Sequence, residues 1–356
     1  MGEKPFRGRQ IAAWMYRRGA TSFDEMTDLS HDLRERLKIE YSFGFPDVAE
    51  RFPSRDGSEK LLLQLADGER IETVRLPYAD RVSVCVSSQA GCAMACQFCA
   101  TGMGGFRRNL TVAEIVAQPL LASRSEEKRV KSEERASNSS LFTSHSSLPT
   151  HIVFMGMGEP LLNVAKVLPS LAIMHDEMSI PYRHITVSTV GILSGIARLA
   201  EAKIPVTLAV SLHAPDDELR HRLIPTSTKT RVLDLVNAAQ DYVRQTGRRV
   251  TWEYVVLGGV NDDAQRAKML ASWCKGWPCH VNLIPWNNVP GANLEEQDFI
   301  ASKPETLREF RSILERNGVT VTQRVQRGAD VAAACGQLRA LKDTSSTRSA
   351  QLITLS

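Results

Sequence analysis

The stretch Cys92-Ala93-Met94-Ala95-Cys96-Gln97-Phe98-Cys99 places three cysteines within eight residues, at the spacing C-x3-C-x2-C. Three thiolates this close together can bind three irons of a [4Fe–4S] cube and leave the fourth iron without a protein ligand. That iron can chelate the amino and carboxylate groups of S-adenosylmethionine (SAM). A zinc site is the alternative, but zinc proteins usually pair C-x2-C half-sites, and this loop has no fourth ligand nearby. The loop therefore predicts an iron–sulfur cluster.

Around this loop, strands alternate with helices from Arg81 onward. Apolar, β-branched runs predict strands at Val82–Val86, Ile152–Met155, Ile185–Val190, Val206–Leu212, Val250–Leu257 and Val281–Ile284. Helical patterns lie between them, such as Thr111–Leu121, which Thr111 and Glu114 can cap. Successive βα units predict a parallel sheet whose active residues lie at the carboxyl ends of the strands. The pattern does not decide between an open sheet and a barrel.

The remaining chain divides into shorter parts. We expect an N-terminal helical, RNA-binding-like domain at 1–45 and a β-hairpin linker at 46–80, where Asp67-Gly68 is a strong turn pair between Lys60–Leu65 and Arg70–Leu76. The core is expected over 81–338. Polar, low-complexity composition predicts a disordered, dispensable insertion at 123–150 and a disordered tail at 343–356.

Composition limits the setting of the protein. The 44 Lys and Arg against 40 Asp and Glu give a net charge of +4, which is compatible with an RNA partner without requiring one. No secretory core follows the polar N-terminus, and no run approaches the about 18 apolar residues that span a bilayer. Seven cysteines is an odd number, which argues for reduced thiols rather than a disulfide framework. We expect a cytoplasmic protein with no membrane partner.

A second motif follows the second strand of the core. Gly156-Met157-Gly158-Glu159-Pro160 would on its own be read as a turn. One βα unit after the cysteine loop, it resembles the "GGEP" element of the radical SAM superfamily, whose backbone and acid engage the amino end of SAM. Phe98, the aromatic residue before the last cysteine, also fits the superfamily signature. The resemblance implies a partial (β/α)6 barrel.

The sequence further resembles the RlmN family of adenine-C2 RNA methyltransferases and the related Cfr C8-methylating enzymes, from about Pro5 to Leu338. The matching stretches are Phe6–Ile11, Cys85–Gln89, the cysteine loop with Ala100-Thr101-Gly102, Arg108–Thr111, Gly156–Pro160, Val187–Gly191, Ser211–Pro215, Asn282–Asn287 and Ala333–Leu338. Family members usually carry another helix before the Phe6-Arg7 element, and the insertion at 123–150 is atypical.

The resemblance implies a role for each of three residues outside the cluster loop. Cys335 takes a methyl group from one SAM; a radical from a second SAM removes hydrogen from that methyl, and the carbon then bonds to adenine C2. Cys85 attacks the Cys335 sulfur, forms a disulfide and releases the methylated RNA. Glu72 is the proton acceptor. Each has a simpler reading: a packed core thiol in a strand for Cys85, a tight packing site for Cys335, and a polar residue on an exposed strand face for Glu72.

The resemblance also implies the cofactor and substrate contacts. The cluster ligands are Cys92, Cys96 and Cys99, and the SAM-binding residues are Gly158, Glu159, Ser188, Ser211, Leu212, His213 and Asn287. His213 alone would more often be a hydrogen-bonded core histidine. The implied partners are 23S ribosomal RNA, the tRNA anticodon loop and a reductase or flavodoxin-type electron donor. A basic surface with Arg7, Arg9, Arg17, Arg18, Arg107 and Arg108 is expected to contact RNA.

Three other functions remain as alternatives. Methylation at C8 of adenine in 23S rRNA, as in the Cfr branch, would use the same two cysteines, and the closer overall match favours C2. A radical-SAM activase or isomerase would need neither Cys85 nor Cys335. A non-catalytic iron–sulfur or zinc RNA-binding protein would not need the Gly158-Glu159-Pro160 element.

Overall fold

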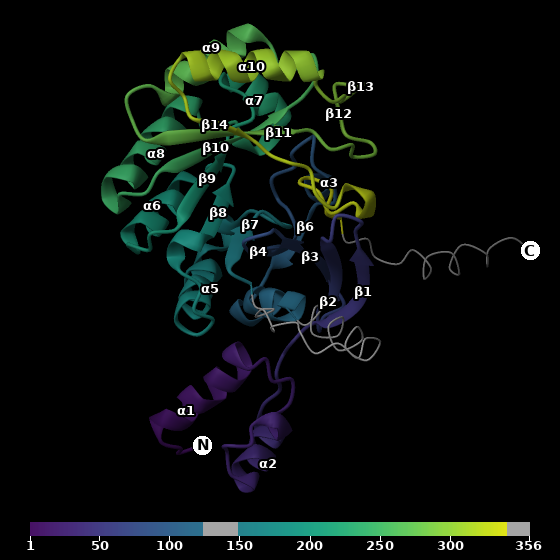
Figure 1. Ribbon diagram of the computed structural model, residues 1–356, viewed down its shortest axis with the longest axis vertical. Helices are drawn as coiled ribbons and strands as arrows, with labels where there is room; N and C mark the ends of the chain where they lie inside the picture. Colours follow the sequence, from purple (N-terminus) through teal and green to yellow (C-terminus); the bar gives the residue numbers. More distant parts are fainter. Residues whose placement is uncertain (124–148, 340–356) are drawn as a thin grey trace, which may run out of the picture.

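The computed structural model describes residues 1–123 and 149–339 of the chain. Within these ranges the main body is a ten-stranded sheet with the order β1-β2-β3-β4-β7-β8-β9-β10-β11-β14 (Figure 1). The strands of its parallel part are β4 (Val82–Cys85), β7 (His151–Phe154), β8 (Ile185–Thr189), β9 (Thr207–Ser211), β10 (Val250–Val256), β11 (Cys279–Pro285) and β14 (Val321–Gln323).

The six predicted core strands are confirmed, each within a few residues of its expected bounds. They are neighbours in the sheet in the same order as in the sequence, so the strand order never reverses as it does in doubly wound sheets. Such single winding curves a sheet toward a barrel. The edge strands β1 and β14 do not pair with each other, so the barrel is partial, as expected. All seven residues of β10 are buried, which is typical of a parallel strand covered on both faces.

Helices cover the outer face of the sheet (Figure 1). They are α5 (Val164–Asp176), α6 (Leu193–Glu201), α8 (Val232–Thr246), α9 (Ala264–Cys274), α10 (Pro304–Arg316) and a helix over residues 112–123. The short helix α7 (Asp217–Leu223) instead packs in the apolar cluster that contains Cys96. The capping box predicted for the helix over residues 112–123 is present. Thr111 N donates to Glu114 Oε2 at 2.8 Å, and Glu114 N donates to Thr111 Oγ1 at 3.2 Å.

The predicted hairpin is confirmed as β2 (Glu59–Gln64) and β3 (Arg70–Pro77). A third strand, β1 (Asp47–Pro53), precedes it and was not predicted. The hairpin is not a separate connection, because β3 pairs antiparallel with β4 and extends the core sheet. Cys85 on β4 thereby stands opposite Val74 on β3.

The N-terminal helices α1 (Pro5–Ala12) and α2 (His31–Glu40) form a small unit that projects from the sheet (Figure 1). Its own core contains Phe23, Met26 and the α2 residues Leu33 and Leu37. Arg17 joins this unit to the end of α5, since its guanidinium donates to the carbonyls of Asp176 and Glu177, each at 3.1 Å.

The insertion predicted at 123–150 falls mainly on residues 124–148, which lie outside the described residues, as does the predicted tail at 343–356. The two ends of the insertion belong to the fold, contrary to expectation. Ser123 is buried at the end of its helix, and Thr150 N donates to Val82 O at 2.9 Å. None of the helices in the described ranges has the length and apolar character needed to cross a membrane.

Candidate active site

The cysteine loop is held between two short antiparallel strands, β5 (Gln89–Gly91) and β6 (Phe106–Asn109), and leads into α3 (Ala100–Met103). Cys92 N donates to Gly105 O at 2.9 Å, and Gln97 N donates to Leu223 O, at the end of α7, at 3.0 Å. The backbone of the loop is therefore anchored on both sides. Cys96 is buried, while Cys92 and Cys99 are partly buried in the same apolar cluster.

The three thiols come from one loop of eight residues. Across the described residues, no group of three or more His, Cys, Asp or Glu side chains is placed to hold a single metal ion. A [4Fe–4S] cube takes one cysteine at each of three irons, so its ligands do not share one metal ion. Burial raises the pKa of all three thiols, that of Cys92 to about 12, so cluster binding must displace their protons.

The Gly158-Glu159 turn lies against β5. Gly158 has a φ of +97°, and a Cβ there would lie 2.4 Å from the Cβ of Gln89, so only glycine allows this approach. Glu159 N donates to Gln89 Oε1 at 2.9 Å. The Glu159 carboxylate accepts from Val190 N at 2.8 Å and from Leu161 N at 2.9 Å. The Thr189 hydroxyl is a further hydrogen-bond partner of the carboxylate. A carboxylate has about four lone-pair sites, so it can still accept from a ligand ammonium.

Electrostatics around this carboxyl are unusual. Glu159 is buried, and burial raises its pKa to about 7, against the backbone hydrogen bonds that lower it. Its charge in turn raises the pKa of Cys92 and Cys96, which places the carboxyl close to the cluster loop. The two sequence motifs are therefore brought together in space.

The other residues expected to bind SAM lie at carboxyl ends of strands. Ser188 is the penultimate residue of β8, Ser211 is the last residue of β9, and Leu212 and His213 follow it. Ser188 and Ser211 are partly exposed, whereas Leu212 is fully buried, and its N donates to Glu253 O at 3.0 Å.

His213 is a buried residue with a left-handed backbone, at a φ of +59°. Its Nδ1 accepts from Val255 N at 3.0 Å, so the neutral ring carries its proton on Nε2. Burial lowers the pKa of His213 to about 3, and the Arg220 charge acts in the same direction. The ring stands edge-on to Phe98 of the cluster loop, with centroids 4.8 Å apart. His213 therefore supplies a fixed N–H donor beside the cluster loop.

The C-terminal loop with Cys335 docks on the cluster loop. Ala100 N donates to Gly336 O at 2.7 Å, and Thr101 Oγ1 donates to Leu338 O at 2.5 Å. Asn287 Nδ2 donates to Cys335 O at 2.9 Å. Asn287 Oδ1 is buried and has no hydrogen-bond partner among the described residues, so it is available to a ligand.

Cys85 and Cys335 line one cavity. Its wall also includes Asn287 and Arg324, together with Leu76, Tyr78, Met155, Ile284, Pro285, Val325, Gln326, Arg327, Ala333, Ala334 and Leu338. Burial raises the pKa of Cys85 to about 12; the Cys335 side chain raises it further, and the Arg324 guanidinium lowers it. Two thiols from opposite ends of the core thus face each other beside one cation.

Arg324 was missed in the sequence. The Cys335 charge raises the pKa of its guanidinium, as do Glu253 and Cys85. Arg324 directly follows β14, and nothing local distinguishes it from an exposed strand arginine. Only the packing of β14 against β11 brings it to the two thiols.

Glu72 does not lie in the wall of this cavity. It is buried on β3, contrary to the reading as an exposed polar residue. Its Oε1 lies 2.9 Å from Lys60 Nζ, and its Oε2 accepts from Arg339 N at 2.7 Å. Lys60, also missed in the sequence, donates in addition to Ala332 O at 3.3 Å. This ion pair ties the hairpin to the Cys335 loop.

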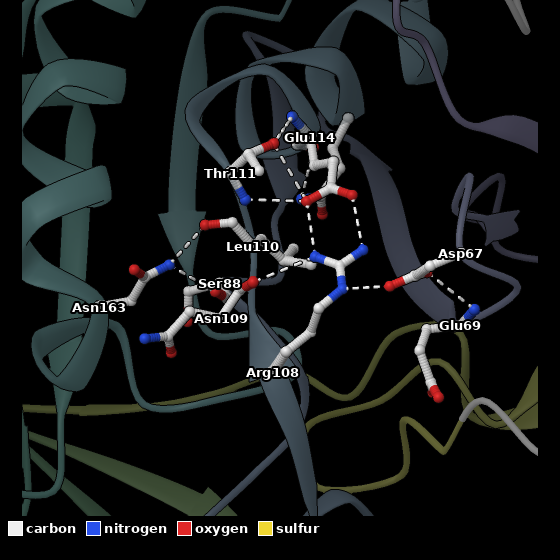
Figure 2. Close-up of polar contacts among 10 residues, drawn as sticks. Asp67, Glu69, Ser88, Arg108, Asn109, Leu110, Thr111, Glu114 and Asn163 are labelled. Atoms are coloured by element: carbon white, nitrogen blue, oxygen red, sulfur yellow. Dashed lines mark hydrogen bonds and ion pairs between the residues drawn. The ribbon is translucent and has the colours of Figure 1, made fainter.

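Arg108, expected to contact RNA, is instead engaged within the protein (Figure 2). Its guanidinium donates to both Glu114 oxygens, at 2.8 and 2.9 Å, and to Asp67 Oδ2 at 2.5 Å. It therefore joins β6, the capped helix and the β2–β3 turn. The next residue, Asn109, accepts from Gln89 Nε2 at 2.8 Å, which links this network to the residue that holds Glu159 N. Arg108 supports the site rather than a partner.

Two family models match the chain. A model of the radical SAM superfamily matches residues 86–270, and a model of the ribosomal RNA large subunit methyltransferase N-terminal domain matches residues 1–42. The barrel, the cysteine loop and the Gly158-Glu159 turn thus belong to a radical SAM enzyme.

Relatives define the family more closely. A probable dual-specificity RNA methyltransferase RlmN from Thermosynechococcus vestitus is 45% identical over 95% of this chain and 93% of its own. A protein of the same description from Bacillus licheniformis is 42% identical over 98% and 91%. The crystal structure of a radical SAM methyltransferase from Sphaerobacter thermophilus superposes with a TM-score of 0.84 at 42% identity, covering 94% and 93% of the two chains. The chain belongs to the RlmN family.

Radical SAM enzymes use a [4Fe–4S] cluster and SAM, and the residues present suit both. Three thiols in one loop are the donor set that such a cluster requires. The Glu159 carboxylate and the unpartnered Asn287 Oδ1 are hydrogen-bond acceptors of the kind that the ammonium and hydroxyl groups of SAM require.

Proposed function

We propose that this protein methylates C2 of an adenine in 23S rRNA, and in tRNA, through a methylated Cys335. The observation that carries the proposal is the shared cavity of Cys85 and Cys335, two thiols 250 residues apart in the sequence. A single methyl transfer would need at most one thiol. In the proposed reaction Cys335 is methylated, becomes bonded to the base through that carbon, and is then joined to Cys85 as a disulfide. This sequence explains why both thiols line one cavity.

The bound cluster and SAM supply a methyl group and a radical that removes a hydrogen atom from the methylated sulfur's carbon. Cys335 first displaces the methyl group from a sulfonium and becomes a thioether. The carbon radical on the Cys335 methyl group then adds to C2 of the adenine. Glu72 accepts the proton that C2 loses, and the single electron released with it would return to the bound cluster, which gave one up when SAM was cleaved. The base is now attached to Cys335 through carbon and sulfur.

Cys85 completes the reaction. Its thiolate attacks the Cys335 sulfur, so that a sulfur–sulfur bond forms and the sulfur–carbon bond breaks. The electron pair of that bond stays with the carbon, which takes up a proton and leaves as the methyl group of the RNA. The disulfide must then be reduced before the next turnover, and we assign this and the cluster electron to a flavodoxin-type reductant.

The mouth of the cavity supports a nucleic-acid substrate. Tyr78 lines it and is 37% exposed. Guanidinium carbons of Arg81 and Arg327 lie 4.3 and 4.7 Å from the centre of its ring. Aromatic and arginine planes in one stack are suited to an unstacked base and its phosphates.

The test is an anaerobic reaction of the cluster-loaded Cys85→Ala variant with SAM and RNA. We expect a covalent protein–RNA adduct through Cys335, resolved by denaturing gel and located by mass spectrometry. The double variant Cys85→Ala/Cys335→Ala should form none, and Cys274→Ala, which alters a buried cysteine outside the cavity, should behave as the parent. SAM cleavage without any adduct would sink the RNA-methylating assignment.

The product distinguishes the two adenine positions. Nucleoside digests of the parent reaction are compared with 2-methyladenosine and 8-methyladenosine standards. We expect the 2-methyl product from 23S rRNA and from tRNA, whereas the 8-methyl product would transfer the protein to the Cfr-like activity with the same thiol chemistry.

A further inference from the structure

Arg220 is fully buried, yet most of its guanidinium has no partner. It lies on α7, and its relative exposure is 0%. Nη2 donates to Val190 O at 2.5 Å. Nε and Nη1 are buried and make no hydrogen bond to any residue that the structure describes. A buried guanidinium is stable only when its donors and charge are satisfied, so a ligand is expected at this point.

The surroundings of Arg220 contain few acceptors. Burial lowers its pKa to about 10, and the charges of Cys96 and Asp217 act in the opposite direction. Asp217 is otherwise engaged, because its Oδ1 accepts from Val232 N at 2.6 Å. His213 offers no acceptor, since its Nδ1 is occupied by Val255 N. Apart from Asp217, the group whose charge acts on Arg220 in this direction is Cys96, in the cluster loop.

Packing independently places α7 against the cluster loop. Leu219 and Leu223 of α7 share an apolar cluster with Cys96. Gln97 N donates to Leu223 O at 3.0 Å, which fixes the end of the helix to the residue after Cys96. Arg220 therefore belongs to the wall of the cluster site, because its helix is hydrogen-bonded to the loop that would hold the iron–sulfur cluster.

We propose that Arg220 donates hydrogen bonds from its two unpartnered nitrogens, Nε and Nη1, to the sulfur atoms of the [4Fe–4S] cluster on the Cys96 side, and thereby favours electron uptake by the cluster. Three thiolates make the loaded site negative, and reduction adds one more negative charge. Hydrogen bonds to sulfur and a nearby cation are among the factors that raise a cluster's reduction potential. The proposal rests on the assignment of Cys92, Cys96 and Cys99 as iron ligands.

The Val190 peptide extends the same argument to Glu159. Arg220 holds the Val190 carbonyl, and the N–H of Val190 donates to Glu159 Oε2 at 2.8 Å. One side chain thus bridges the cluster loop and the carboxyl expected to bind SAM. Arg220 is a positioning residue in this sense, in addition to its contact with the cluster.

The experiment uses the full chain as parent, Arg220→Met, Arg220→Lys and Arg222→Met. Arg222 is the matched control: it lies two residues along α7 and forms an exposed ion pair with Glu295 at 2.8 Å. Three quantities are measured: thermal unfolding of the iron-free protein, the midpoint potential of the reconstituted cluster by EPR-monitored titration without SAM, and SAM affinity from the change in the EPR signal.

For Arg220→Met we expect an iron-free protein at least as stable as the parent, because a buried unpaired charge is removed. The reduction potential of its cluster should be more negative than that of the parent. The potential of Arg220→Lys should lie between those of Arg220→Met and the parent, and that of Arg222→Met should equal the parent's. If Arg220→Met fails to retain four irons, Arg220→Lys carries the test: it should still lie below the parent, since ammonium lacks the two-pronged geometry.

Three results would overturn the proposal. An unchanged potential with weaker SAM binding assigns Arg220 to the SAM carboxylate instead. An unchanged potential with unchanged SAM binding would mean that Arg220 acts only through its hydrogen bond to the Val190 carbonyl. Lower stability of the iron-free Arg220→Met protein would mean that the fold itself satisfies the guanidinium. A parent that binds no cluster fails the ligand assignment itself and is recognised by iron analysis before any variant is compared.

Discussion

Lys60 Nζ lies 2.9 Å from Glu72 Oε1, on neighbouring strands of the sheet, and the two side chains are only 9% and 5% exposed. Burying both charges costs hydration that their attraction offsets only while both are present. The ion pair therefore keeps the Glu72 carboxylate buried beside the loop that ends the core. There Arg339 N donates a hydrogen bond to its other oxygen, Oε2. For Glu72 to accept a proton from substrate, that backbone contact must give way.

Lys60→Met should destabilise the protein by about 3–5 kcal/mol, because it leaves the Glu72 carboxylate buried without its counter-charge. The double variant Lys60→Met/Glu72→Gln should be more stable than Lys60→Met alone. Chemical denaturation of the three proteins measures this, with the exposed Lys268→Met as control. Equal stability of Lys60→Met and parent would show that water or relaxation satisfies Glu72.

Release of RNA from the Cys335 adduct should accelerate with pH. Burial raises the pKa of Cys85 to about 12, and only the thiolate attacks sulfur, so the reactive fraction grows about tenfold per pH unit below that value. Single-turnover reactions quenched between about pH 7 and 9 should show a steady rise in release without a plateau. A plateau near the ordinary thiol pKa would mean that Cys85 becomes exposed to water during turnover.

Arg324→Met should slow the same step while leaving methylation of Cys335 intact. A cation close to a thiol lowers its pKa by about 1–3 units, so its loss should reduce adduct release about tenfold or more. The adduct should then accumulate although Cys85 is present. Arg324→Lys should retain most of the rate, and the exposed Arg316→Met all of it. If Arg324→Met instead prevents methylation of Cys335, its role lies earlier in the reaction.

Two adjacent arginines should respond differently to charge reversal. Arg107 is exposed, whereas Arg108 is bound to Glu114 and Asp67 (Figure 2). Arg107→Glu should weaken RNA binding and reduce its salt dependence by about one phosphate contact, with little effect on unfolding. Arg108→Glu should cost about 2 kcal/mol of stability by gathering three acids. Salt-dependent RNA binding and thermal unfolding are measured for both variants. Normal RNA binding by Arg107→Glu, or normal stability of Arg108→Glu, would contradict this division of roles.

Local pattern was enough for the parallel strands and the two sequence motifs. Strands such as β10 are rich in β-branched and aromatic residues, and the spacing of the three cysteines can be read directly from the sequence. The edge strand β1 escaped prediction because its residues alternate in no regular way; it pairs only with β2 and is largely exposed. Its strand geometry comes from the ladder, not from its own sequence.

Residues that act through distant partners could not be predicted. Whether Glu72 is exposed depends on which face of the hairpin meets the C-terminal loop, and that is decided by register. Arg220 and Arg324 have no local signal, since a charged residue on a short helix or after a strand is ordinarily solvated. The cysteine loop could be recognised in the sequence because its three cysteines lie within eight residues of one another.

The contacts between the cluster loop and the residues after Cys335 also constrain how the protein is made. Thr101 and Leu338, joined by a hydrogen bond, are 237 residues apart in the chain. Synthesis is vectorial, and amino-terminal segments emerge from the ribosome first. On the proposed mechanism, the segment that would bind iron is therefore available long before the segment that would carry the methyl group. A nascent chain would then be able to load metal while it is still unable to modify any nucleic acid, including the ribosome that is producing it.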